Sequence, residues 1–251
     1  MPNRTKILQI HPDIDPMSPR EWDNACTMAC WHRRYTLGDE RPSEDPEGFM
    51  MSLIEDQVND TCFEEELGMY TDFLYEHRDW TLDQCAQHTT DVIHEVFDKH
   101  FISLPLYLYD HGNITMSCGP FSCPWDSGQV GFIFIPRSVA AEEWNSDDKS
   151  FPQIRNTSMG DREFASLEEL VHYYMRGEVE TYDQYLRGDV YGFVLLDEHG
   201  EEEDSCWGFY GDDWRTNGIT DHVDMSEVKA VHRMEPCQRT TMEPAEVEEL
   251  T

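Results

Sequence analysis

Positively charged side chains are scarce in this chain. Its 251 residues hold 18 Lys and Arg against 52 Asp and Glu, and only four of the 18 are Lys. Proteins hold the phosphate backbone of DNA and RNA mainly through Lys and Arg. The small basic group His32, Arg33 and Arg34 is too weak to act against a formal charge of −34. The shortage therefore excludes direct binding of nucleic acid.

Long apolar runs are missing as well. No stretch approaches the ~18 apolar residues of a membrane span, and the polar start MPNRTKILQIHPD lacks the apolar centre of a signal peptide. We therefore expect no membrane partner and a cytoplasmic location. Because disulfides are rare in the cytoplasm, the eight Cys residues are expected to be reduced thiols.

Several catalytic signatures are absent too. The chain contains no G-x-x-x-x-G-K-[ST], no G-x-G-x-x-G, no H-E-x-x-H and no EF-hand loop. Nucleotide binding and zinc-peptidase chemistry by these routes are thereby excluded. We predict no cofactor, and a non-enzymatic protein is favoured over an enzyme.

What the chain does have is a large excess of acid. Duplex DNA carries one negative charge per ~1.7 Å, so a charge of −34 corresponds to roughly 17 base pairs, or about 58 Å of duplex. Such a surface attracts basic proteins. The excess is uneven, at −12 over residues 1–84, −7 over 85–168 and −15 over 169–251. Two interpretations stay open: a phosphate-mimicking surface, and an ordinary acidic protein adapted to high salt.

Apolar spacing predicts an α+β fold, with N-terminal helices followed by a mostly antiparallel sheet built from hairpins and a long helix. We expect one domain, 1–251, with a helical part at 1–103, a sheet-rich part at 104–211 and an acidic C-terminal segment at 212–251. Helices are predicted at 18–34, 49–58, 63–77, 82–100, 138–144 and 163–186. Strands are predicted at 6–10, at 129–135 and in hairpins over 104–118 and 190–211. Residues 145–160 are expected to form a loop, and the tail after Met234 to fray.

Two cysteines and a histidine near the N-terminus raise the question of a metal site. Cys26, Cys30 and His32 lie within seven residues, and Cys118 with Cys123 could complete the ligand set. The spacings, C-x3-C-x-H and C-x4-C, are less regular than those of structural zinc. Buried free thiols are the favoured interpretation.

A second group of reactive side chains lies around the loop CGPFSCPWDSGQ. There Cys123 is a candidate nucleophile with His111 in the preceding turn, and Asp126 is a candidate acid or base. No helix is predicted to begin at the cysteine, and the order of Gln, Cys and His differs from that of papain-like enzymes. A rigid turn is favoured, and an enzyme or small-ligand site over residues 110–128 is the alternative hypothesis.

Two segments place aromatic residues among acids, REWDNACTMACWHRRY and DSCWGFYGDDW. Aromatic anchors beside carboxylates suit the recognition of an Arg-rich surface, which they bind through stacking and charge together. Most of these aromatic side chains are nevertheless expected to lie in the core.

Four segments are similar to a family of uncharacterised proteins encoded by bacteriophages and other mobile elements: PREWDNACTMACWHRRYTLGD, LPLYLYDHGNITMSCGPFSCPWDSGQVGFIFI, EVETYDQYLRGDVYGF and DSCWGFYG. The resemblance covers about half the chain, and FSCPWDSGQVGFI is its most specific part. Gly112 stands where that family usually has a Ser after the YDH motif. The resemblance implies a viral origin and action inside a host cell, and it implies no activity, cofactor or catalytic residue.

The charge and this resemblance together predict a non-enzymatic inhibitor of a host defence or nucleic-acid-binding protein. It would present a surface like that of DNA or RNA to a basic partner. The predicted binding residues are carboxylates around the second hairpin and within residues 55–66: Asp197, Glu198, Glu201, Glu202, Glu203, Asp204, Asp212, Asp213, Glu55, Asp56, Glu64, Glu65 and Glu66.

Overall fold

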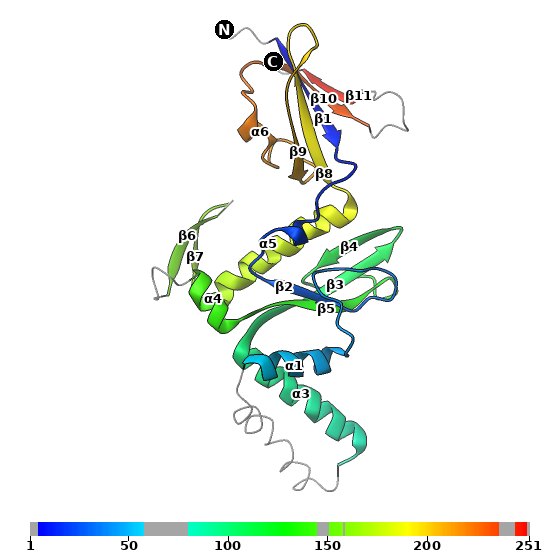
Figure 1. Ribbon diagram of the computed structural model, residues 1–251, viewed down its shortest axis with the longest axis vertical. Helices are drawn as coiled ribbons and strands as arrows, with labels where there is room; N and C mark the ends of the chain where they lie inside the picture. The colour runs from blue at the N-terminus through cyan, green and yellow to red at the C-terminus, as the bar shows by residue number, and fades with distance from the viewer. Residues whose placement is uncertain (1–4, 58–79, 145–150, 158, 236–243, 250–251) are drawn as a thin grey trace. The chain divides into compact units, whose positions relative to one another are not determined.

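The computed structural model describes residues 5–57, 80–144, 151–157, 159–235 and 244–249. Within these ranges the chain has an α+β fold with five α-helices and three sheets (Figure 1). The chain divides into two compact units. Unit 1 comprises Met1–Trp22, Asp110–Met116 and Glu178–Thr251, and unit 2 comprises Asp23–Tyr109 and Ser117–Gly177.

Unit 1 is built on a five-stranded mixed sheet with the order β11-β10-β1-β8-β9. The first strand, β1, runs parallel to β10, and the other neighbouring pairs are antiparallel. The predicted strand at 6–10 and the predicted second hairpin are confirmed as β1 and as β8 with β9. The bounds are β1 Lys6–Pro12, β8 Val190–Leu196, β9 Glu202–Tyr210, β10 Val228–Met234 and β11 Pro244–Glu249.

The core of unit 1 covers one face of this sheet. Alternation along the strands directs Leu8 and Ile10 of β1 and Phe193 and Leu195 of β8 to the same side. The short helix α6, Ile219–His222, and the segments next to it close this core. Its other members are Phe209, Trp214, Ile219, Val223, Val228 and Val231.

A second sheet has four strands in the order β2-β5-β3-β4. The predicted apolar strand at 129–135 is confirmed as β5, which lies between two partners. The predicted first hairpin is confirmed as β3 and β4, which are joined at Gly112 with a φ of 88°. The bounds are β2 Thr27–Cys30, β3 Phe101–His111, β4 Asn113–Ser117 and β5 Ser127–Pro136.

Two helices pack against the aromatic side of this second sheet (Figure 1). They are α1, Pro46–Gln57, and α3, Leu82–His100. Thr81 and Gln84 form a reciprocal capping box at the start of α3, which explains why it begins where the sequence predicts. The shared core is rich in Phe: Ala29, Phe49, Met50, Ile54, Ile93, Val96, Phe97, Phe101, Phe132 and Phe134.

Three further elements follow β5. The predicted short helix is confirmed as α4, Arg137–Trp144, and the predicted long helix as α5, Leu167–Arg187. The long helix ends at Gly188, whose φ of 78° suits a glycine after a helix C-terminus. Part of the predicted loop at 145–160 is instead a hairpin of β6, Gln153–Thr157, with β7, Gly160–Phe164.

The prediction of a helix at residues 18–34 is wrong, whereas the helices predicted at 49–58 and 82–100 are confirmed as α1 and α3. Residues 18–34 form a single 3₁₀ turn at Pro19–Glu21 and then strand β2. Ser18 caps only this one turn, and the apolar run TMAC is buried by pairing with β5. The Met28 N–H donates to an Asp39 carboxylate oxygen at 2.7 Å, which further fixes β2 as a strand.

The C-terminal segment also differs from the prediction. Residues 228–234 form β10, and the tail predicted to fray returns as β11, which pairs with β10. A strand that pairs in parallel with β1 gives no local hairpin signal, because its partner is far away in the sequence. The predicted helix at 63–77 lies outside the described residues, and the single-domain arrangement stays a prediction. Among the helices that the structure describes, none is long and apolar enough to cross a membrane.

Candidate functional site

The turn between β8 and β9 is held by a carboxylate. Asp197 Oδ1 accepts hydrogen bonds from the main-chain N–H groups of His199 at 2.8 Å and Glu201 at 2.9 Å. Gly200, with a φ of 82°, completes the turn. The main-chain donors of Glu201 and His199 lower the pKa of Asp197. Asp197 therefore fixes the shape of the hairpin, and the neighbouring carboxylates are presented on a defined backbone.

Beyond this turn, acidic residues follow one another along β9. Glu201, Glu202, Glu203 and Asp204 are all exposed. Two of them have local partners at Ser205: Glu202 accepts from its hydroxyl at 2.9 Å, and Asp204 accepts from its main-chain N–H at 2.8 Å. These bonds hold the carboxylates on the strand without removing their charge.

One lysine partly offsets this charge. Lys6 Nζ lies 2.8 Å from Glu203 Oε1 and 2.7 Å from Glu227 Oε2. The hydrogen bonds to Glu203 and then Glu227 raise the pKa of Lys6 above its ordinary value. A single positive charge is shared by two carboxylates, so this group of three residues keeps a net negative charge.

The acid is also denser in the unit that carries this hairpin. Unit 1 has 24 acidic and eight basic residues among 103, and unit 2 has 28 and ten among 148. The negative charge per residue is therefore higher in unit 1.

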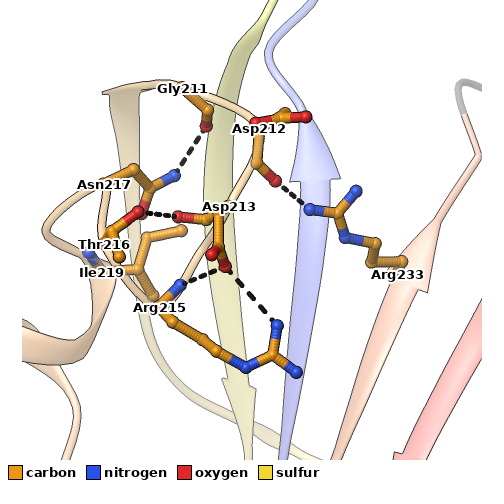
Figure 2. Close-up of polar contacts among 8 residues, drawn as sticks. All are labelled: Gly211, Asp212, Asp213, Arg215, Thr216, Asn217, Ile219 and Arg233. Atoms are coloured by element: carbon orange, nitrogen blue, oxygen red, sulfur yellow. Dashed lines mark hydrogen bonds and ion pairs between the residues drawn. The ribbon is translucent and has the colours of Figure 1, made fainter.

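A tight polar loop follows β9 (Figure 2). Asp213 Oδ1 accepts from the main-chain N–H of Arg215 at 3.1 Å, and the Arg215 guanidinium lies 3.4 Å away. The main-chain oxygen of Asp213 accepts from the N–H groups of Thr216 and Asn217, each at 3.0 Å. The Asn217 amide donates to the Gly211 oxygen at 3.0 Å. Asp213 is therefore mainly a structural residue of this loop.

The same loop is tied to β10 through Arg233. Its guanidinium donates to the main-chain oxygen of Asp212 (Figure 2). It also lies 5.8 Å from the centre of the Tyr191 ring. Both predicted binding residues of this loop, Asp212 and Asp213, are exposed. They follow the end of β9 opposite to the turn.

The remaining predicted binding residues are not on this hairpin. Glu55 and Asp56 are exposed on α1 in unit 2, and Glu64, Glu65 and Glu66 lie outside the described residues. The structure thus brings together the carboxylates of 197–204 on one hairpin, and Glu55 and Asp56 belong to a different unit.

The surroundings of the candidate catalytic residues differ from those of an activated nucleophile. Cys123 Sγ lies 3.6 Å from Asp126 Oδ2, and its main-chain oxygen accepts from the Ser127 hydroxyl at 2.5 Å. Activated cysteines lie beside cationic groups, whereas this neighbour is a carboxylate. Burial raises the pKa of the other thiol of this loop, Cys118, to about 11. His111 belongs to unit 1 and Cys123 to unit 2.

The candidate metal ligands also have separate environments. Cys26 and Cys30 are buried free thiols. His32 Nδ1 accepts from the main-chain N–H groups of Tyr35 at 3.1 Å and Arg34 at 3.4 Å, and its ring stacks on Tyr35 with centres 5.0 Å apart. In the part of the chain that the structure describes, no group of three or more His, Cys, Asp or Glu residues is arranged to hold a metal ion.

Sequence reasoning singled out two aromatic segments but did not pair them. The structure joins them: the Trp22 and Tyr210 rings meet edge to face, with centres 5.2 Å apart. The Tyr210 hydroxyl donates to the main-chain oxygen of Met17. The only signal in the sequence was the shared composition of the two segments, aromatic residues beside acids.

No family model, curated protein or solved structure matches this chain. The resemblance to the phage proteins therefore stays a prediction.

Proposed function

We propose that this chain is a phage-encoded, non-enzymatic inhibitor that occupies the basic nucleic-acid-binding surface of a host protein, for instance a defence protein. The carboxylates of the β8–β9 hairpin would take the place of phosphates. The observation that carries the proposal is the run of exposed acids Glu201–Asp204, which leads from the turn held by Asp197 into the edge strand β9.

The spacing of these acids supports the proposal. A β-strand rises about 3.3–3.4 Å per residue, and one strand of duplex DNA carries a charge about every 3.4 Å. Consecutive acids along β9 therefore match the linear charge density of one DNA strand. Because successive side chains point to opposite faces, each face carries half of that density.

The position of β9 supports a basic partner in particular. An edge strand has unpaired backbone groups and tends to pair with edges of other chains. The acids of β9 repel a second copy of the same strand. They attract a positively charged surface, and this attraction weakens as salt rises.

The alternative hypotheses have less support. At residues 110–128 the thiol of Cys123 bonds to a carboxylate, and the Trp125 ring is 92% exposed, so it is not enclosed by neighbouring side chains. A protein coated with acid only for high salt would carry it evenly, whereas unit 1 carries more negative charge per residue than unit 2.

Displacement from DNA tests the proposal. Proteins of a bacterial lysate are bound to a duplex-DNA resin, and the chain is added at low and at high salt. We expect the chain to release basic proteins at low salt and to release fewer as salt rises. The triple variant Glu201→Gln, Glu202→Gln and Asp204→Asn should release markedly less than the natural chain.

A matched triple variant in unit 2 serves as the control. Glu142→Gln, Glu143→Gln and Asp161→Asn also removes three exposed carboxylates and should release as much protein as the natural chain. The proposal is wrong if nothing is released at low salt, if release does not depend on salt, or if both triple variants lose release equally.

A further inference from the structure

Exposed apolar side chains of the segment after β1, here called the apolar patch, belong to unit 1. In the segment after β1, Ile14 is 84% exposed, Met17 62% and Trp22 46%. Large apolar side chains exposed together are typical of interaction sites. Trp and Tyr are also the residues most often found as energetic anchors of protein interfaces.

The aromatic pair of this patch is held in place from several sides. Trp22 ends the 3₁₀ turn that Ser18 caps, and its ring and that of Tyr210 are nearly perpendicular. Tyr210 in turn is bonded through its hydroxyl to the main-chain oxygen of Met17. The main-chain N–H of Asp13 donates to the Val190 oxygen at 2.8 Å, which ties the start of the segment to β8.

Carboxylates lie next to this pair. Asp13 precedes Ile14, and the exposed Glu21 directly precedes Trp22. Burial raises the pKa of Tyr210 most, and electrostatic interactions with Tyr185, Asp13 and Glu21 add to the rise. Aromatic rings and carboxylates are therefore neighbours in this part of unit 1.

The chain's own arginine in this segment is engaged elsewhere. Arg20 Nη1 donates to Glu178 Oε2 at 2.8 Å, with both side chains largely buried. Glu178 therefore neutralises Arg20, which adds little positive charge to offset Asp13 and Glu21. The surface is thus complementary to a cation supplied by a partner.

We infer that Trp22 and Tyr210, with Asp13 and Glu21, form a binding surface for an arginine side chain of a basic partner. A guanidinium can stack on an aromatic face and bond a carboxylate with its flat, forked set of N–H groups, whereas a lysine ammonium is more strongly hydrated and lacks the planar group. The surface therefore selects arginine over lysine at equal charge.

This inference rests on the proposed function, because it names the side chain by which the basic partner is anchored. The arginine surface and the charge mimicry make different predictions. Mimicry by charge alone treats arginine and lysine alike, whereas stacking at Trp22 does not.

Two peptides of equal length and charge separate these cases. One alternates Arg and Gly, and the other alternates Lys and Gly; their binding to the full chain is measured by calorimetry at low salt. We expect the Arg peptide to bind about fivefold more tightly than the Lys peptide, within the range of a cation–π contact at a partly exposed site. In Trp22→Ala this ratio should fall to about one, with Lys-peptide binding unchanged.

A tryptophan in unit 2 provides the matched control. Trp125→Ala removes a more exposed ring and should keep the natural preference for Arg. If Trp22→Ala does not fold, as judged by circular dichroism, Trp22→Leu keeps the apolar volume without the aromatic face and should also lose the preference. Trp22→Phe keeps an aromatic face and should retain part of it.

The outcomes distinguish the two proposals. Equal binding of both peptides to the natural chain, or an unchanged Arg preference in Trp22→Ala or Trp22→Leu, overturns the arginine surface and leaves the mimicry proposal standing. No binding of either peptide at low salt contradicts both.

Discussion

Arg20 and Glu178 form an ion pair with little exposure to solvent. Nη1 and Oε2 are 2.8 Å apart, and the two side chains are only 5% and 16% exposed. This pair ties the 3₁₀ turn before β2 to α5 within unit 1. Removing one partner of a buried pair leaves a charge without compensation, which costs more than the pair contributes.

We expect Arg20→Ala to lower the free energy of unfolding by about 2–4 kcal/mol, because the largely buried Glu178 carboxylate would lose the charge that compensates it. Urea denaturation measures this change. Lys99→Ala removes an exposed pair with Glu95 on α3 and should cost less than about 0.5 kcal/mol. Equal effects of the two variants would contradict the importance of burial at Arg20.

The burial of His11 is expected to make the stability of the fold depend on pH. Burial lowers its pKa below the ordinary value, so near pH 6 the unfolded chain takes up a proton more readily than the folded chain. The stability that depends on neutral His11 is fully present above about pH 6.5, the ordinary pKa of histidine in the unfolded chain. It is lost as the pH falls from there through the lower pKa of the folded chain. His11→Gln should make this fall shallower, as measured by melting temperature against pH.

Gly131 permits a close approach of two strands. A Cβ at this position of β5 would lie 2.0 Å from the main-chain oxygen of Ala29 in β2. We expect Gly131→Ala to destabilise the fold by about 1–3 kcal/mol or more, since backbone atoms must shift. A Cβ at Gly192 would meet the Trp207 ring at 2.3 Å and the main-chain oxygen of Cys206 at 2.8 Å. Because the overlap with the backbone is smaller there than at Gly131, Gly192→Ala should cost less, and the reverse order in thermal unfolding would contradict this account.

Gly177 is expected to behave in the opposite way. It lies inside α5, and a Cβ there would have no neighbour within 4 Å. Alanine is a better helix former than glycine by roughly 0.5–1 kcal/mol. Gly177→Ala should therefore raise the melting temperature, and a fall would show that the position carries a constraint other than helix propensity.

The parts of the fold that were predictable are those with local signals. Helix α3 has both a capping box at Thr81 and an apolar stripe ending at Phe97, and it was predicted with its observed ends. Strand β5 was predicted because its apolar run has no polar alternation, as a central strand requires. In both cases neighbouring residues carry all the information.

The features that were not predicted correctly depend on residues far away in the sequence. Residues 26–30 have apolar spacing that suits a helix, but Met28, Ala29 and Cys30 are buried because β5 pairs with them. Likewise, the sequence marked both aromatic segments of the candidate site, yet Tyr210 bonds to Met17, 193 residues earlier in the chain. A single sequence does not report such pairings.

The place of β1 in its sheet has a consequence for how unit 1 is made. This strand is synthesised first, yet it lies between β8 and β10, and Lys6 aligns with Val228. On the ribosome β1 must therefore wait for β8, Val190–Leu196, before it has a first neighbour, and for β10, Val228–Met234, before it has the second. Strands β2, β3 and β5 are complete by Pro136, and domains generally form as their residues emerge. We expect β1 to remain without its sheet through most of translation, a period in which chaperones can bind its apolar residues.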